Sequence, residues 1–111
     1  MTTMKAGDFD IEAKVTLLGP ERGGRTSSVR SGYRPQHRVR PDYLTSGTHE
    51  YIDREALPPG ETARARIKFI TPEAYPGCIA VGDVLEISEG SRLVGWAEVT
   101  RIVNGTLARV D

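Results

Sequence analysis

The chain has 111 residues, of which 38% are hydrophobic and 27% charged, and this composition is that of one ordinary soluble domain. Its 15 basic and 15 acidic residues give a formal net charge of zero, so the total charge indicates no nucleic acid, membrane or acidic partner. The single cysteine, Cys78, excludes an internal disulfide, and no stretch approaches the roughly 18 apolar residues of a membrane span. Because the N-terminus also lacks the apolar core of a signal peptide, we expect a cytoplasmic protein.

The N-terminal region leads into the first predicted strand. We expect residues 1–9 to be a flexible N-terminus and residues 10–111 to form a single domain. In the stretch Ile11–Leu18, apolar residues alternate with mostly polar ones. A period of two places successive side chains on opposite faces, so this stretch is predicted to be a half-buried strand.

The stretch GPERGGRT, Gly19–Thr26, has the glycine and threonine spacing of a phosphate-binding loop, but Arg25 stands in place of the lysine. Such a loop works because a helix follows it and its backbone N–H groups face the phosphates. Here Gly32 and Pro35 would break a helix soon after it began. We therefore predict a turn between two strands, and no binding or hydrolysis of GTP or ATP.

A basic segment follows, with no acidic residue between Glu21 and Asp42. A strand over Tyr33–Arg40 would place alternate side chains on one face, about 6.6 Å apart. The residues on that face are Arg34, Gln36, Arg38 and Arg40. A row of guanidinium groups can bind phosphates or carboxylates in bidentate fashion. The alternative is a solvated face whose charge is balanced by acidic neighbours on adjacent strands; the candidates are Glu50, Asp53 and Glu61.

The rest of the chain also favours strands. Further strands are predicted at His49–Asp53, Ala63–Ile70, Asp83–Ser88 and Leu93–Val103, with Gly and Pro clusters between them. Arg54–Leu57 is expected to form one helical turn at most. Trp96, in the last strand, is expected to be a core residue. Together the pattern predicts an almost entirely β protein, a small antiparallel barrel or sandwich, with its first and last strands adjacent.

The stretch GGRTSSVRSGYRPQHRVR, Gly23–Arg40, resembles part of the C-terminal β-barrel, the third domain, of translation elongation factor Tu. That domain has a GGR turn, a short spacer and then GYRPQ. The stretches DIEAKVTLLGPE, TSGTHEY, LPPGETARARIKFITP and ISEGSRLVGWAEVTRIV resemble other parts of it, in the same order. The resemblance covers about Asp10–Val103. It implies a six-stranded antiparallel barrel of the translation-factor type, here as a standalone chain that has no room for the GTPase domain.

The resemblance also implies a binding surface. Positions that lie against the T stem of transfer RNA in the family are matched here by Arg25, Gln36, Thr45, Glu89 and Gly90. With the arginines of the basic strand, Arg34, Arg38 and Arg40, they make up the predicted RNA- or partner-binding site. Glu86 stands where the family has a small apolar residue near its GTPase domain, which implies that docking onto such a domain is not retained in its usual form.

The sequence has no recognisable catalytic or metal site. Ser27, Ser28 and His37 lack an acidic partner at a defined spacing, and no pair among His37, His49 and Cys78 has the spacing of metal ligands. We expect no enzyme activity, cofactor, metal or membrane partner. Two functions stay open: a translation-linked module that binds tRNA-like structured RNA or a protein partner of elongation factor Tu, and a decoy or immunity protein that occupies a toxin directed against that factor.

Overall fold

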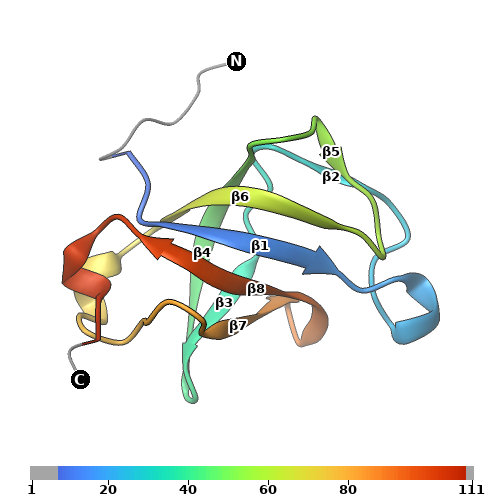
Figure 1. The fold of residues 1–111 in the computed structure, drawn as a ribbon. Coiled ribbons are helices and arrows are strands. Elements are labelled where there is room, and N and C mark those ends of the chain that lie inside the picture. The colour runs from blue at the N-terminus through green and yellow to red at the C-terminus, as the bar shows by residue number, and fades with distance from the viewer. Residues whose placement is uncertain (1–7, 110–111) are drawn as a thin grey trace.

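The computed structural model describes residues 8–109, which form a closed barrel of six antiparallel strands with a small separate sheet (Figure 1). Around the barrel the strands follow in the order β1, β6, β4, β3, β7 and β8, and β8 pairs again with β1. They span Ile11–Leu17 (β1), Gln36–Arg40 (β3), Tyr43–Tyr51 (β4), Thr62–Phe69 (β6), Val84–Glu89 (β7) and Arg92–Ile102 (β8). The all-β barrel predicted from the sequence is confirmed, as is the adjacency of its first and last strands.

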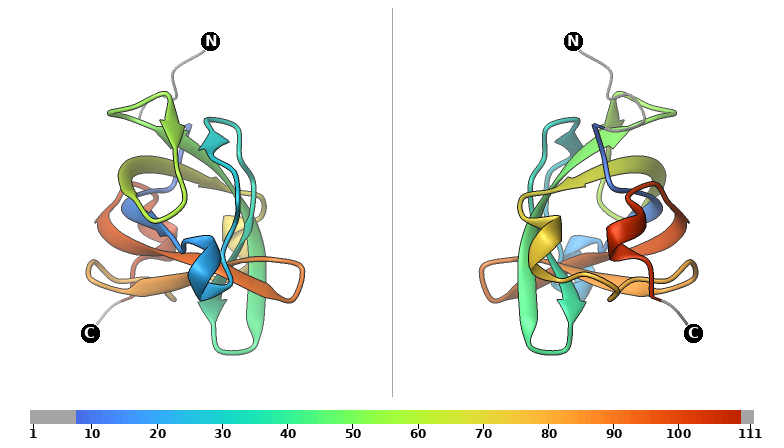
Figure 2. Two further views of the ribbon diagram at one scale, coloured as in Figure 1. Left: turned by 90° about the vertical axis from the view of Figure 1, so that its right-hand side faces the viewer. Right: turned by 90° about the vertical axis from the view of Figure 1, so that its left-hand side faces the viewer.

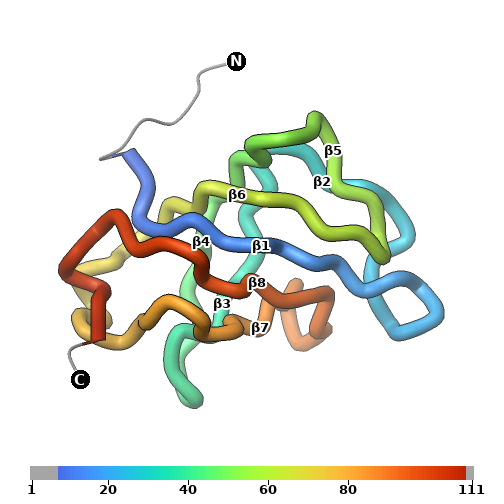
Figure 3. Tube along the Cα trace, viewed as in Figure 1, coloured from blue at the N-terminus to red at the C-terminus, as the bar shows by residue number. Residues whose placement is uncertain are grey.

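Strand β1 lies between β6 and β8, as the trace in Figure 3 shows. Its alternate residues Ile11, Ala13, Val15 and Leu17 face the interior and are at most 1% exposed. The other strands contribute inward side chains in the same way, and together they fill the barrel. The period-two pattern read from the sequence is therefore the pattern of burial.

The small sheet pairs β2 (Val29–Arg30) with β5 (Ala56–Leu57) beside the barrel. The stretch Arg54–Leu57, for which the sequence allowed one helical turn at most, forms no helix; Leu57 is fully buried and pairs with Val29 across this sheet. Strand β4 begins at Tyr43 rather than at His49. Its first half is rich in Ser, Thr and Gly, which hides the apolar alternation, yet it pairs with β3 through most of that length.

The turns include three short 3₁₀ segments, η1 (Pro20–Arg22), η2 (Pro72–Ala74) and η3 (Gly105–Leu107). The stretch Gly19–Thr26 is the predicted turn: η1 ends at Arg22, Gly23 caps it with a φ of 82°, and no helix lies between it and β2. Glycine adopts this left-handed conformation without steric cost. Among residues 8–109, no helix has the length and apolar character that crossing a bilayer would require.

A buried carboxylate joins the strands at one end of the barrel. Asp10 accepts hydrogen bonds from the backbone N–H of Phe69 at 2.7 Å and from the Asn104 side chain at 2.9 Å. Phe9 is only 4% exposed and packs under the guanidinium of Arg66, so the last residue of the expected flexible N-terminus belongs to the core. Residues 1–7 of that expected segment lie outside the described part of the chain.

Candidate functional site

The predicted site residues Arg25 and Glu89 lie together on the outside of the barrel. Arg25, in the turn before β2, contacts Glu89 at the end of β7 with an Nη1–Oε2 distance of 2.5 Å. The hydroxyl of Tyr33 donates to the same carboxylate oxygen, also at 2.5 Å, and the Arg25 guanidinium lies 5.4 Å from the centre of the Tyr33 ring. Sequence positions that are 64 residues apart thus form one polar cluster.

The contacts in this cluster favour an ionised Glu89 carboxylate and a neutral Tyr33 hydroxyl. Burial acts to raise the pKa of Glu89, but the hydrogen bonds from Tyr33 and Arg25 outweigh it, and the pKa is lowered. The pKa of Tyr33 is raised, first by burial and then by its bond to the Glu89 carboxylate. Arg25 also donates to the Ser27 hydroxyl at 3.0 Å. Arg25 is therefore held by internal partners and contributes a positioned, largely neutralised charge.

Gln36 and Gly90 connect this cluster to the neighbouring strands. Gln36 is half-buried in β3 and pairs with Ser46 of β4 on one side and Ser88 of β7 on the other. Gly90 forms the turn between β7 and β8 with a φ of 59°, directly after Glu89. The outer face of β4, β3 and β7 therefore carries Gln36 at its centre and the Arg25–Glu89 pair at one edge.

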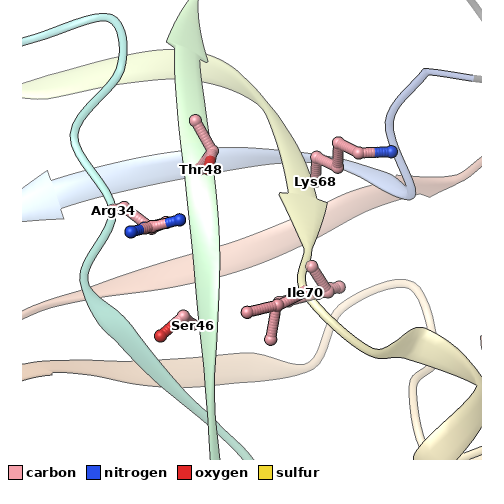
Figure 4. A pocket seen from close by; sticks show the side chains of 6 residues that line it. Arg34, Ser46, Thr48, Lys68 and Ile70 are labelled. Carbon is pink, nitrogen blue, oxygen red and sulfur yellow. The ribbon is translucent and has the colours of Figure 1, made fainter.

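Arg34 lies apart from the other strand arginines. The strand predicted at Tyr33–Arg40 begins only at Gln36, and Arg34 stands in the extended segment before it, next to β4. It lines a hollow of about 200 Å³ with Ser46 and Thr48 of β4 and with Lys68, Phe69 and Ile70 on the β6 side. Figure 4 shows Arg34 on one side of β4, with its guanidinium toward that strand, and Lys68 on the other side with its ammonium extending away from β4.

The hollow beside Arg34 carries positive charge without a balancing acid. Among the described residues, its lining includes two cations and two hydroxyl groups but no carboxylate. Within residues 8–109, neither Arg34 nor Lys68 forms an ion pair. The electrostatic field of this hollow therefore favours an anion, and the arginine fork suits a phosphate or carboxylate.

Arg38 and Arg40 border a different region, where β3 approaches β7. Arg38 contacts Glu86 at 3.3 Å and donates to the Pro41 carbonyl at 2.5 Å. A bulge between Arg38 and Arg40 shifts the register with β4, so the regular face drawn from the sequence does not continue to Arg40. The single arginine row expected from the sequence is thus two groups, with Arg34 in one and Arg38 and Arg40 in the other.

Two expectations about these side chains need correction. Thr45 is 5% exposed and its hydroxyl bonds to the Tyr75 hydroxyl at 3.1 Å inside the barrel, so it is not part of the outer surface. The acid that pairs with Arg38 is Glu86, and not one of the three acids that the sequence offered as the alternative for the arginine face, Glu50, Asp53 and Glu61. Glu50 and Glu61 instead pair with Arg66 and Arg54.

The structure also brings together two histidines that the sequence did not connect. His37 of β3 and His49 of β4 are both fully buried, and their Nε2 atoms are 2.8 Å apart. Nδ1 of His49 lies 3.0 Å from the Tyr51 hydroxyl, whereas Nδ1 of His37 has no hydrogen-bond partner among the described residues. The signal in the sequence was that both histidines occupy inward positions of paired strands. Residues 8–109 contain no group of three or more His, Cys, Asp or Glu side chains placed to hold a metal ion.

A comparison with models of known protein families finds none that matches this chain. The structure shows the architecture alone, a small six-stranded antiparallel barrel.

Proposed function

We propose that the chain is a non-catalytic binding module, similar to the third domain of translation elongation factor Tu, that binds the phosphate backbone of a structured RNA. The observation that carries the proposal is the hollow lined by Arg34, Lys68, Ser46 and Thr48, where within residues 8–109 the two cations form no ion pair and the lining includes no carboxylate. We name the outer surface that includes this hollow, Gln36 and the Arg25–Glu89 pair the β3–β4 face.

The arrangement of charges favours a polyanion over one small anion. Arg34 and Lys68 lie on opposite sides of β4, so each can contact a different phosphate along a backbone (Figure 4). Hydroxyl groups such as those of Ser46 and Thr48 also commonly donate to phosphate oxygens. The zero net charge of the chain does not oppose this, because binding depends on the local field within about 10 Å at ordinary salt.

The resemblance to elongation factor Tu supports the same face independently. Of the matched positions, Gln36 pairs with Ser46, which lines the hollow, and the Arg25–Glu89 pair and Gly90 lie at the edge of this face, on the β7 side. Because Arg25 is already engaged by Glu89, its expected contribution is to shape the surface, and Arg34 and Lys68 supply the available charge.

The test is the salt dependence of RNA binding. Fluorescence anisotropy with a labelled RNA hairpin should give a dissociation constant of about 10⁻⁴–10⁻⁶ M at physiological salt, as for contacts dominated by phosphates. Arg34→Gln and Lys68→Gln should each weaken binding and reduce the slope of log affinity against log salt by about one. The matched control is Arg64→Gln, an equal charge change at an exposed position of the same strand as Lys68.

Equal slopes for the wild type, Arg34→Gln and Lys68→Gln would contradict the assignment of the site. No binding to the hairpin at low salt would contradict RNA binding altogether. The alternative function, a decoy or immunity protein, predicts a complex with a protein toxin instead, and size-exclusion chromatography of the two proteins would detect it.

A further inference from the structure

The barrel has a gap in its hydrogen bonding between β3 and β7. These neighbouring strands pair at only two positions, Gln36 with Ser88 and His37 with Ile87, although each strand continues for three more residues. The continuing residues are Arg38–Arg40 of β3 and Val84–Glu86 of β7, and we name the region between them the seam. On their other sides these residues are paired, β3 with β4 and β7 with β8.

A surface hollow coincides with the seam. Its volume is about 560 Å³, and its lining includes all six residues of the two unpaired segments. Val39 and Leu85 form its floor, because both are buried and belong to the core. The β3–β4 hairpin leads away from the barrel at this point, and its tip extends past β7 in both views of Figure 2. The strands therefore separate on the outside while core side chains still close the interior.

Unpaired strand edges are sites for strand addition, since their N–H and C=O groups are free to bond with another extended chain. The charges around the seam indicate what that chain carries. Asp83 is held by Arg109 through two contacts of 3.1 and 3.2 Å, and Glu86 contacts Arg38. Arg40 contacts the Pro76 carbonyl at 3.4 Å and the Cys78 thiol, but within residues 8–109 it forms no ion pair, so its charge remains for a carboxylate of the incoming chain.

We propose that the seam binds an extended peptide segment of a partner protein, with acidic side chains alternating with apolar ones. Alternation follows from strand geometry, because successive side chains of an added strand face opposite ways. One set would contact the apolar floor of Val39 and Leu85. The other would lie on the outer face, where Arg38, Arg40 and the exposed side chain of Val84 are. The Arg38–Glu86 contact spans the seam, and as an exposed pair it is weak enough to open when the peptide enters.

The seam is distinct from the RNA-binding hollow proposed above. Arg34 and Lys68 line the hollow over β4 and not the seam, whereas Arg40 lines the seam and not that hollow. Charge changes at Arg40 and at Lys68 therefore serve as controls for each other.

The experiment uses a displayed library of random peptides selected on the whole protein. Enriched sequences should alternate acidic with apolar residues, and their affinity should fall at least about tenfold for Arg40→Gln and further for Arg40→Glu, as for a lost charged hydrogen bond. Lys68→Glu should leave the affinity unchanged. Bound peptide should slow hydrogen exchange in Arg38–Arg40 and Val84–Glu86, and should slow alkylation of Cys78, the only cysteine, which also lines the seam.

Three results would overturn the proposal. One is a selection that enriches no peptide, and a second is enriched peptides that bind wild type and Arg40→Glu equally. The third is binding that leaves hydrogen exchange in both segments unchanged, because a peptide held only by side chains would not pair with the backbone of the seam. Circular dichroism of Arg40→Gln would establish that this variant retains the strand content of the wild type.

Discussion

At the residue scale, the least expected feature is the buried histidine pair. Burial lowers the pKa of His37 to about 4, and burial together with the adjacent ring of His37 lowers the pKa of His49 well below its usual value. The 2.8 Å contact between their Nε2 atoms excludes protonation of both rings at once, because one nitrogen must donate and the other must accept. The rings of Tyr33, Tyr51 and Phe69 surround the pair and supply no carboxylate to balance a positive charge.

The pair predicts acid sensitivity of the folded state. In the unfolded chain the histidines titrate near pH 6.5, so between about pH 6.5 and pH 4 the unfolded state binds more protons than the folded one. The free energy of unfolding should therefore be fully retained above about pH 7 and fall with decreasing pH, by on the order of 1 kcal/mol per pH unit for each histidine. Urea denaturation between pH 7.5 and 5 measures this dependence.

The control for this prediction is the double variant His37→Leu/His49→Leu, which has neither imidazole. Its stability at neutral pH will differ from that of the wild type, but the decline between pH 7 and pH 5 should be much shallower. The same slope in the double variant and the wild type would show that other groups cause the acid sensitivity.

At the element scale, the close approach of β1 and β8 depends on a glycine. A Cβ atom added to Gly95 of β8 would lie 2.1 Å from the backbone oxygen of Thr16 in β1. Backbone cannot move aside as a flexible side chain can, so the two strands would have to separate. Gly95 also pairs with Ile87 of β7, and a shift of β8 would disturb both of its neighbours.

We predict that Gly95→Ala destabilises the barrel by about 1–3 kcal/mol or more, the usual cost of forcing extra volume into a packed region. The matched control is Gly105→Ala in η3, because an added Cβ there has no atom within 4 Å. Thermal or urea denaturation of the two variants compares these costs. Equal stability of the two variants would mean that β8 can move away from β1 without loss of pairing.

At the scale of the whole molecule, closure of the barrel is reinforced by Asp10. Its carboxylate binds the end of β6 through Phe69 and the segment after β8 through Asn104, while its own carbonyl accepts from the backbone N–H of Val103 and of Asn104. One residue next to β1 thus connects both strands that flank β1. The hydrogen bonds between strands close the barrel by themselves. The contacts of Asp10 add a link between the end of β6 and the segment that follows β8.

Asp10→Ala should lower the free energy of unfolding by about 1–3 kcal/mol or more, because the Phe69 N–H would stay buried without an acceptor. The control is Glu73→Ala, which removes an exposed acid from η2 and should change stability by no more than about 0.5 kcal/mol. Urea denaturation monitored by Trp96 fluorescence gives both values. A loss for Asp10→Ala no larger than that for Glu73→Ala would contradict the structural role of this carboxylate.

Local patterns in the sequence determined much of the fold. The alternation in Ile11–Leu18 and Ala63–Ile70 predicted β1 and β6, and the glycines of the stretch Gly19–Thr26 predicted a turn. These predictions succeeded because each depends on a local property, either the alternation of side chains along one strand or the φ angle of one glycine. Residues close together in the sequence determine such properties. The prediction for Trp96, which was expected in the core, is wrong. Trp96 lies half-buried on the outer face beside Thr16 and Glu86. The inward positions of this part of β8 belong to Ala97 and Val99, and the sequence pattern was ambiguous there.

Only the tertiary structure decided which side chains meet. The sequence placed Arg34, Arg38 and Arg40 in one row, but strand β3 starts after Arg34 and a bulge follows Arg38, so the row divides into two groups on separate hollows. The contacts of Arg25 with Glu89 and of His37 with His49 likewise join distant segments. Such contacts depend on strand order and register, and these are set by the packing of the whole barrel rather than by any local stretch of sequence.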